Sequence, residues 1–251
     1  MYRTFFRPKW LLTHLLVITL VVVMVNLSLW QFRRLDERKA FNAVVLLNAA
    51  QPVIPLEKLL SSDPATIEWR RVVVRGVFNA NKEVIAVNRS QDGTAGADPI
   101  TPFTFTAGTK THLVLVDRGF VPLSEVSPAP PKGEVELVGR VRLTQNHRIG
   151  SLSDPSTGVL KEVQHINISR LGRQMQSSAN ETVAPFYLDL LESPQITTPL
   201  PARVANPTTS NGSHLSYAIQ WLLFSACAIG AWVLLVKRSL TASKPTSSLV
   251  E

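Results

Sequence analysis

The sequence predicts a membrane protein of the α+β class, in which two transmembrane helices flank an antiparallel, β-rich extracytoplasmic domain with one or two short helices. Two observations predict this architecture. Residues 11–30 and residues 215–236 contain no Asp, Glu, Lys or Arg, and about 20 predominantly apolar residues are enough for a helix to cross a bilayer core of about 30 Å. The stretch between them contains repeated short runs of β-branched residues, which are typical of strands.

Residues 1–10 are expected to form a cytoplasmic tail, and residues 11–30 the first transmembrane helix. A cleaved signal peptide is the alternative for this run. Its apolar stretch is longer than the roughly 7–15 residues of a secretory signal, and the bulky Trp30 and Phe32 follow it in place of a small-residue cleavage pattern. We therefore expect an uncleaved anchor. The tail is too short for an organelle transit peptide, which favours a bacterial plasma membrane.

Residues 31–214 are expected to fold outside the cytoplasm around a sheet. The runs of β-branched residues are separated by Gly, Pro, Asn and Asp, and Val135 and Leu137 flank Glu136 in the alternation of a half-buried strand. Because no long helix separates the runs, they predict an antiparallel sheet that is either closed into a barrel or packed as a sandwich. The expected strands are residues 69–78, 83–89, 103–106, 112–120 and 134–143, with a late strand at residues 186–191.

Helix is expected at three further places in this segment. Residues 32–48 continue the first span as a juxtamembrane helix, and residues 56–60 form a short turn. Residues 167–176 form a helix with Asn167 at its N-cap, since apolar residues follow it at helical spacing.

The last part of the chain returns to the membrane. Residues 197–212 are rich in Pro, Thr and Asn and predict a tether. The tether leads into the second transmembrane helix, residues 215–236. Residues 237–251 are expected to form a disordered cytoplasmic tail, since Ser, Thr and Pro dominate them.

The charge of the chain is concentrated in its membrane flanks. The formal net charge is +8 and the pI is near 10. Residues 1–10 carry +3 and residues 237–251 carry +2, whereas residues 40–214 carry 16 Lys or Arg and 15 Asp or Glu. A nearly neutral domain does not support nucleic-acid binding, which requires a basic surface. The cationic flanks are instead expected to meet the anionic head groups of the lipid bilayer.

The same charges say little about orientation. Six Lys or Arg lie in the tails, and five lie close to the membrane in the segment between the spans. Long domains translocate largely regardless of their charge. We therefore expect a multi-pass protein of the plasma membrane with both termini in the cytoplasm.

The sequence contains no motif that marks an enzyme. It has no Gly-rich phosphate loop, no His-Glu-x-x-His and no Gly-x-Ser-x-Gly. The single cysteine, Cys227, lies in the second span and excludes an internal disulfide, a cysteine zinc site and an iron–sulfur cluster held by this chain alone. None of the five histidines lies three or four residues from another, so no local metal clip is expected.

Two histidines lie in or beside the spans. His14 is inside the first, and His214 directly precedes the second. A polar side chain at a membrane edge commonly extends to the interface with no further role. Imidazole is also the usual axial ligand of haem iron, and an apolar macrocycle can bind between helices. On the residues alone, both roles stay open for His214.

An ordered series of short motifs resembles the Surfeit locus protein 1 family. It starts with WQFRR at residues 30–34 and ends with HLSYAIQW at residues 214–221. Each motif alone is weakly specific, but their order, spacing and two-span frame are together specific over residues 30–236, apart from the poorly matched residues 147–212. The motifs between the two ends are RVVVRGVF at residues 71–78, VNR at 87–89, Gly96 before TPF at 101–103, VLVDRGFVP at 114–122 and VGRVR at 138–142.

The resemblance implies a non-enzymatic function in the assembly of haem-copper cytochrome c oxidase. Members of the family are thought to act as chaperones that hold or deliver haem a while the catalytic subunit of the oxidase matures. The resemblance therefore implies haem a as cofactor. It implies the catalytic subunit and the proteins of haem a synthesis or oxidase assembly as partners. It also implies a β-rich extracytoplasmic domain between two membrane helices, with both ends of the chain in the cytoplasm.

The resemblance also implies a site. The family's membrane-edge histidine, proposed as a ligand of haem iron, corresponds to His214. Tyr217 and Trp221 share a helical face with His214, and we expect them to line the macrocycle. The chain departs from the family at Phe120, where Trp is common, and at Ser213, where Asn commonly precedes the histidine.

Two other functions remain open. One is a haem-independent membrane scaffold that stabilises an oxidase assembly intermediate, and it predicts copurification with oxidase subunits from cells that lack haem a. The other is an unrelated membrane-tethered sensor whose outer domain binds a small ligand. The sensor predicts an intact oxidase spectrum in a deletion strain.

Overall fold

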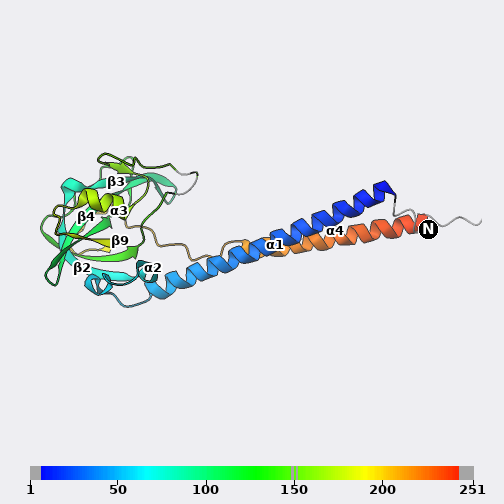
Figure 1. Ribbon diagram of the computed structural model, residues 1–251, viewed down its shortest axis with the longest axis horizontal. Coiled ribbons are helices and arrows are strands. Elements are labelled where there is room, and N and C mark those ends of the chain that lie inside the picture. The colour runs from blue at the N-terminus through cyan, green and yellow to red at the C-terminus, as the bar shows by residue number, and fades with distance from the viewer. Residues whose placement is uncertain (1–6, 148–149, 151, 243–251) are drawn as a thin grey trace, which may run out of the picture. The chain divides into compact units, whose positions relative to one another are not determined.

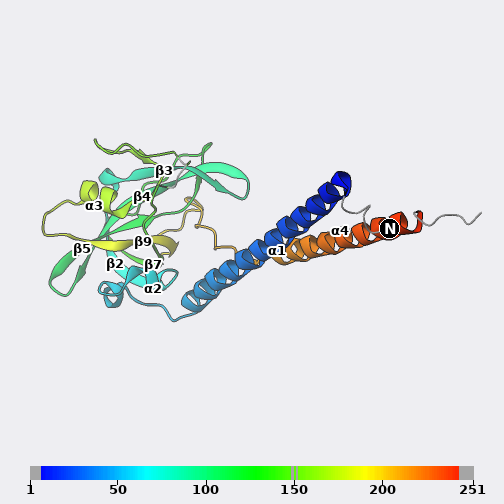
Figure 2. The ribbon, with the colours of Figure 1, turned by 45° about the vertical axis from the view of Figure 1, so that its right-hand side comes forward.

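The computed structural model describes residues 7–147, 150 and 152–242 (Figures 1 and 2). Most of the two expected tails, residues 1–6 and 243–251, lies outside the described residues. The chain divides into two compact units, which we describe separately. The helical unit comprises the described residues of Met1–Ala43 and Thr209–Glu251, and the β unit comprises those of Val44–Thr208.

The helical unit is built from α1 (Pro8–Ala49), whose last residues belong to the β unit, and α4 (His214–Ala242). Both helices are long and apolar enough to cross a membrane by length and composition. The expected first span and juxtamembrane helix form one unbroken helix. Most of their large apolar side chains are exposed, for example Leu16 on α1 and Leu223 on α4, as expected for surfaces that face lipid.

The two helices meet along a seam. On each, a continuous series of buried or partly buried residues advances in alternating steps of three and four. This spacing packs helices side by side, as in coiled coils. The seam residues are His14, Val17, Val21, Met24, Ser28, Gln31, Leu35, Arg38 and Asn42 on α1, and His214, Ala218, Trp221, Ser225, Ala228 and Trp232 on α4.

Five strands of the β unit close into a barrel. They pair in the order β2, β7, β9, β5, β4, and a further pairing of β4 with β2 completes the ring. Their bounds are β2 (Arg71–Phe78), β4 (Thr94–Ala107), β5 (Lys110–Asp117), β7 (Glu134–Arg142) and β9 (Thr182–Glu192).

Shorter elements surround the barrel. β3 (Val84–Gln91) pairs with the first half of β4. The expected helix at residues 167–176 is α3 (Ile168–Met175), and Asn167 caps it by accepting a hydrogen bond from the Arg170 backbone N–H at 3.0 Å. The remaining elements are β1 (Ile54–Pro55), β6 (Val121–Pro122), β8 (Glu162–Val163), α2 (Pro64–Ile67) and the 3-10 helices η2 (Leu56–Leu59) and η3 (Ala80–Lys82).

The expectation of an antiparallel sheet is wrong in part, because the sheet is mixed. β9 runs parallel to β5, and the short β1 and β8 run parallel to β2 and β3. Parallel neighbours need a long connection. The chain between β5 and β9, which includes β7, β8 and α3, provides this connection.

The barrel wall separates two hydrophobic cores. Successive side chains of a strand point to opposite faces. On β5, Val114 and Val116 belong to one core, and Leu113 and Leu115 belong to the other. The first core collects residues from all five barrel strands. The second includes the buried residues of α3, so that helix covers one outer part of the wall.

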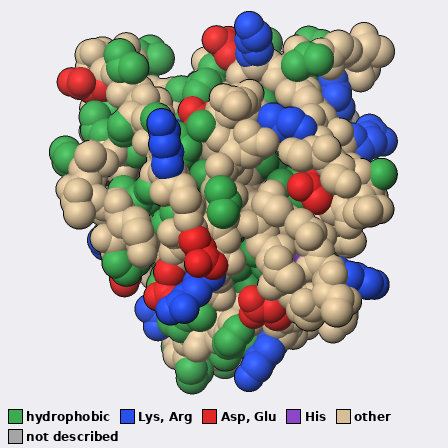
Figure 3. All heavy atoms as spheres, turned by 90° about the vertical axis from the view of Figure 1, so that its left-hand side faces the viewer, with side chains coloured by type: hydrophobic (Ala, Val, Ile, Leu, Met, Phe, Trp, Pro, Cys, Tyr) green, Lys and Arg blue, Asp and Glu red, His purple; other side chains and the backbone are tan. Residues whose placement is uncertain are grey.

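The surface of the β unit carries charges of both signs. Figure 3 shows one face, on which Lys and Arg side chains are scattered among acidic and hydrophobic ones. This distribution matches the nearly neutral charge of residues 40–214.

Candidate functional site

His214 forms a hydrogen bond across the seam of the helical unit. Its Nδ1 lies 2.8 Å from Oε1 of Gln31. An amide oxygen can only accept, so Nδ1 carries the proton in this pair, and a neutral His214 has its lone pair on Nε2. Histidines that bind metals commonly donate one ring N–H to a carbonyl and coordinate through the other nitrogen. The contact therefore leaves His214 in the tautomer that can bind iron.

Gly212 leaves room beside that nitrogen. It has a φ of +67°, and a Cβ added to it would lie 3.7 Å from Nε2 and 3.6 Å from Cδ2 of His214. A side chain at position 212 would thus touch the imidazole edge that carries the lone pair. The donor chemistry of His214 and the space beside it both fit an iron ligand.

The structure places the other two predicted site residues, Trp221 and Tyr217, in different surroundings. Trp221 lies on the seam and is partly buried, with its ring edge-to-face with Phe224 at 6.1 Å. Tyr217 lies off the seam and is 49% exposed. Among the described residues, Gln31 is the side chain that forms a hydrogen bond with the imidazole of His214.

His14 makes the opposite hydrogen bond at the other end of the seam. The indole Nε1–H of Trp232 donates to Nδ1 of His14 at 2.9 Å. Since Nδ1 accepts here, a neutral His14 carries its proton on Nε2. At a rise of about 1.5 Å per residue, His14 and Gln31 are separated by about 26 Å along α1. His14 is therefore a separate contact and does not share a site with His214.

The helices are in direct contact next to His214. Ser28 donates to the backbone oxygen of Ala218 at 2.9 Å, and both residues are fully buried. Small side chains let two helix backbones approach closely. This approach fixes the register that places Gln31 opposite His214.

Polar residues of α1 hold the chain segment that precedes α4. Asn42 Nδ2 donates to the backbone oxygen of Thr209 at 2.8 Å and to Oδ1 of Asn211 at 3.1 Å. Arg38 Nε donates to the backbone oxygen of Ser210 at 3.1 Å. Sequence reasoning missed these positioning residues. The signal was the seven-residue spacing that places Arg38 on the same helix face as Gln31.

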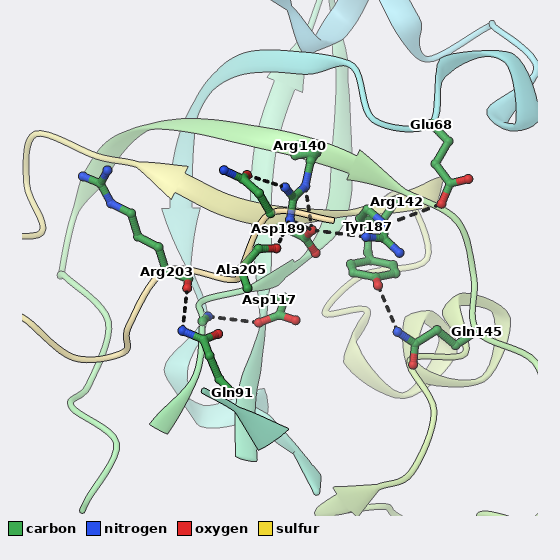
Figure 4. Close-up of polar contacts among 12 residues, drawn as sticks. Glu68, Gln91, Asp117, Arg140, Arg142, Gln145, Tyr187, Asp189, Arg203 and Ala205 are labelled. Carbon is green, nitrogen blue, oxygen red and sulfur yellow. Dashed lines mark hydrogen bonds and ion pairs between the residues drawn. The ribbon is translucent and has the colours of Figure 1, made fainter. Parts of the chain in front are cut away.

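The β unit contains a buried ionic network (Figure 4). Arg140 donates to Oδ2 of Asp189 through Nε at 2.9 Å and through Nη2 at 2.7 Å, and both side chains are almost inaccessible. Arg140 also donates to the backbone oxygen of Ala205 and to Oδ1 of Asn206. It therefore fastens the segment after β9 to the barrel.

Two further carboxyl groups lie close to this network. Burial raises the pKa of Asp117 well above its ordinary value, and the charges of Asp98 and Asp189 raise it further. Burial also raises the pKa of Asp98 to about 6, although the neighbouring Arg89 opposes this. Asp117 Oδ1 accepts a hydrogen bond from the Gly119 backbone N–H at 3.0 Å. Asp117 and the adjacent Arg118 are both buried, which indicates a structural role.

Arg118 makes its own buried contacts on the other side of β5. It pairs with Glu83 at 2.8 Å and donates to Thr101 Oγ1 at 3.0 Å. Among the residues that the structure describes, no group of three His, Cys, Asp or Glu side chains is arranged to hold a metal ion. The β unit thus uses its charges to fix the ends of strands.

The sequence model of the SURF1 family matches residues 18–226, which extend from α1 into α4. Surfeit locus protein 1 of Takifugu rubripes is 26% identical over 235 residues, covering 84% of this chain and 91% of that protein. Surfeit locus protein 1 of Homo sapiens is 28% identical, covering 82% of this chain and 72% of that protein. An uncharacterized SURF1-like protein of Mycobacterium tuberculosis is 28% identical, covering 88% and 81%. The match runs through both long helices and the barrel, and the chain therefore belongs to the SURF1 family.

Proposed function

We propose that the chain is an assembly factor for haem-copper cytochrome c oxidase, and that it binds haem a as cargo without catalysing a reaction. Its membership of the SURF1 family supports the oxidase role, because the motif series of the sequence resembles oxidase assembly proteins. Two helices of membrane length support a location in the bilayer, where an apolar porphyrin partitions. The proposed partners are the catalytic subunit of the oxidase and the proteins that supply haem a.

The hydrogen bond between Gln31 and His214 carries the haem proposal. It keeps the proton on Nδ1 and the lone pair on Nε2. When haem a is bound, its iron supplies the Lewis acid that this nitrogen would coordinate. Gln31 orients the ring, and Gly212 keeps space beside Nε2.

The close helix contact bears on where a macrocycle would lie. Ser28 and Ala218 touch beside His214, which leaves no gap for a porphyrin between the helices at that point. Tyr217 is exposed and can contact such a ligand directly. Trp221 is on the seam, and we propose that it holds the helices in register next to the site.

The proposal is tested by purifying the full-length protein from cells that make haem a and recording its absorption spectrum. The wild type is expected to carry haem a, and H214A is expected to lose most of it. H14A is the matched control and is expected to keep it, because His14 presents a protonated Nε2. Equal haem content in H214A and the wild type would overturn the ligand role of His214.

A second variant tests the role of Gln31. Q31L removes the acceptor and is expected to lower haem affinity by about 10- to 100-fold, as losses of groups that orient metal ligands do. Q31E keeps an acceptor and is expected to retain more haem than Q31L. Equal haem binding by Q31L and the wild type would contradict this positioning role.

The oxidase role is tested separately. A deletion strain is expected to lose the oxidase spectrum, and the wild-type gene is expected to restore it. An intact spectrum would favour the membrane-tethered sensor. Copurification with oxidase subunits from cells that lack haem a, together with a haem-free protein from cells that make it, would favour the haem-independent scaffold.

A further inference from the structure

A polar cavity of about 610 Å³ lies in the β unit, where the ends of β3 and β7 meet the chain that follows β8. This volume is in the range of small-molecule sites, roughly 300–1,000 Å³. Its described lining includes a single carboxylate, that of Glu68. The polar side chains that matter here are Arg89, Arg142, Gln145, Gln164 and Glu68.

Arg142 contributes a flat guanidinium group to the lining of this cavity. Its Cζ lies 3.8 Å from the centre of the Trp69 ring, which fixes the plane of the group. Its ion pairs are long, 3.5 Å to Glu68 and 3.7 Å to Asp189. The buried Nε of Arg142 has no hydrogen-bond partner among the described residues.

Arg89 is in a similar state on the neighbouring strand. Its Nε is 3.3 Å from Asp98 Oδ2, but the geometry is not that of a hydrogen bond and the buried Nε has no such partner among the described residues. Two guanidinium groups thus line one cavity, and the buried Nε of each lies beside a carboxylate. A molecule in the cavity would be bound by the terminal nitrogens of the two groups, because the Nε atoms are inaccessible.

Amide side chains complete a wall of donors. Gln164 Oε1 accepts from Asn88 Nδ2 at 2.7 Å, which leaves the amide NH₂ of Gln164 to donate. Gln145 is fixed from three sides, since Oε1 accepts from Arg89 Nη2 and the Ile166 backbone N–H, both at 3.2 Å, and Nε2 donates to Tyr187 at 3.0 Å. Figure 4 shows Gln145, Tyr187, Arg142 and Glu68 on this side of the barrel. The wall is therefore held in place before any ligand arrives.

We propose that this cavity binds a small oxyanion, the phosphate or carboxylate group of a soluble ligand, with Arg89 and Arg142 as its charged donors. Guanidinium groups match the planar pairs of oxygens in these anions and can bind them with two parallel hydrogen bonds. A cation in this cavity would be repelled by the two arginines. The site lies in the β unit and does not depend on haem binding in the helical unit.

The test uses the full-length protein in an uncharged detergent, titrated with inorganic phosphate and separately with succinate. Binding is measured by isothermal calorimetry and by the shift of the thermal midpoint. We expect saturable binding of at least one probe with a Kd at or below about 1 mM. The tighter probe assigns the chemistry of the natural ligand's head group. Absence of saturable binding for both probes would overturn the proposal.

Variants locate the binding in this cavity. R142Q is expected to weaken it at least tenfold, and R142K, which keeps the charge but loses the fork, is expected to weaken it less. R75Q is the matched control, because Arg75 is on β2, is 72% exposed and pairs with Glu136 outside the cavity. Binding by R142Q as tight as that of the wild type would contradict the assignment. If R142Q fails to fold, Q164A decides, since it removes one donor from the wall and is expected to weaken binding several-fold.

Discussion

Three carboxyl groups lie close together on neighbouring strands of the barrel, and each is held away from water. Asp117 and Asp189 are buried on β5 and β9, which pair at these two positions, and Asp98 lies on β4 beside Arg89. Removing a carboxylate from water favours its neutral form. Each of the three has a raised pKa for this reason first, and the arginines around Asp189 and Asp98 only reduce the effect.

The sign of the resulting pH dependence can be stated for Asp98. Its pKa is about 6 in the folded protein and about 3.9 in an unfolded chain. Between these values the folded state binds the proton more tightly, so this group lowers the free energy of unfolding as the pH rises from about 4 to about 6. D98N, which cannot ionise, is expected to lack this loss.

The measurement is the free energy of unfolding of the full chain and of D98N in detergent, at several pH values from 4 to 7.5. The difference between the two is expected to grow in favour of D98N by at most about 3 kcal/mol as the pH rises through this window. A difference that stays constant with pH would contradict the assigned cause.

At the scale of elements, the barrel closes through one glycine. β2 and β4 pair only at Val77 with Thr104 and at Phe78 with Phe103. A Cβ added to Gly76 would lie 2.2 Å from the backbone oxygen of Thr104 and 2.8 Å from Cε1 of Phe103. The closing contact therefore requires the absence of a side chain at this position.

G76A is expected to destabilise the β unit by about 1–3 kcal/mol, the typical cost of forcing a methyl group into a packed site. The readout is the thermal midpoint of the full chain, followed by circular dichroism in the β-sheet region. G230A is the matched control, because a Cβ there meets nothing within 4 Å and the glycine is inside a helix. Equal midpoints for G76A and the wild type would show that the barrel adjusts to the added methyl group without loss of stability.

Local pattern predicts most of the strands and misses those features that depend on distant partners. The expected strand at 134–143 is β7, and the expected strand at 69–78 is β2, which starts two residues later because Trp69 has a positive φ of 73°. The expected strand at 103–106 is the end of the longer β4, since Gly and Pro residues conceal its first half.

The parallel pairing of β9 and the buried Arg140–Asp189 pair were beyond such prediction. Arg140 and Asp189 are 49 positions apart, and nothing in their local sequence shows that β7 and β9 are neighbours. For the same reason, the sequence singles out His214 but cannot show that Gln31 faces it, because the register of two helices depends on the contact between Ser28 and Ala218. The spacing alone places Tyr217 and Trp221 on one helical face with His214. The packing of α4 against α1 separates them, because Trp221 is partly buried and Tyr217 is exposed.

At the scale of the whole molecule, the proposed topology divides the chain between two compartments. With both termini in the cytoplasm, the β unit lies outside. The single native cysteine, Cys227, is within α4 and can be replaced by alanine to give a background for labelling. Lys110, the exposed first residue of β5, and Lys237, on α4 beyond the expected span, are suitable reporters.

In a C227A background, K110C is expected to react with a membrane-impermeant maleimide in intact spheroplasts. K237C is expected to react only after the membrane is permeabilised. Mass spectrometry or a gel shift reads out the labelled fraction. The reverse pattern would place the β unit in the cytoplasm and contradict the proposed orientation.

The two histidines of the helical unit also define a distance along α1. His14 and His214 each make a cross-helix hydrogen bond, and the two bonds are separated by about 26 Å along α1. The hydrocarbon layer of membranes averages about 30 Å and varies by a few ångströms between membranes. In any membrane whose hydrocarbon layer is thicker than about 26 Å, at least one of these polar pairs would lie in hydrocarbon unless the bilayer thinned around it. The helix pair thus carries its own preference for bilayer thickness, through hydrophobic mismatch.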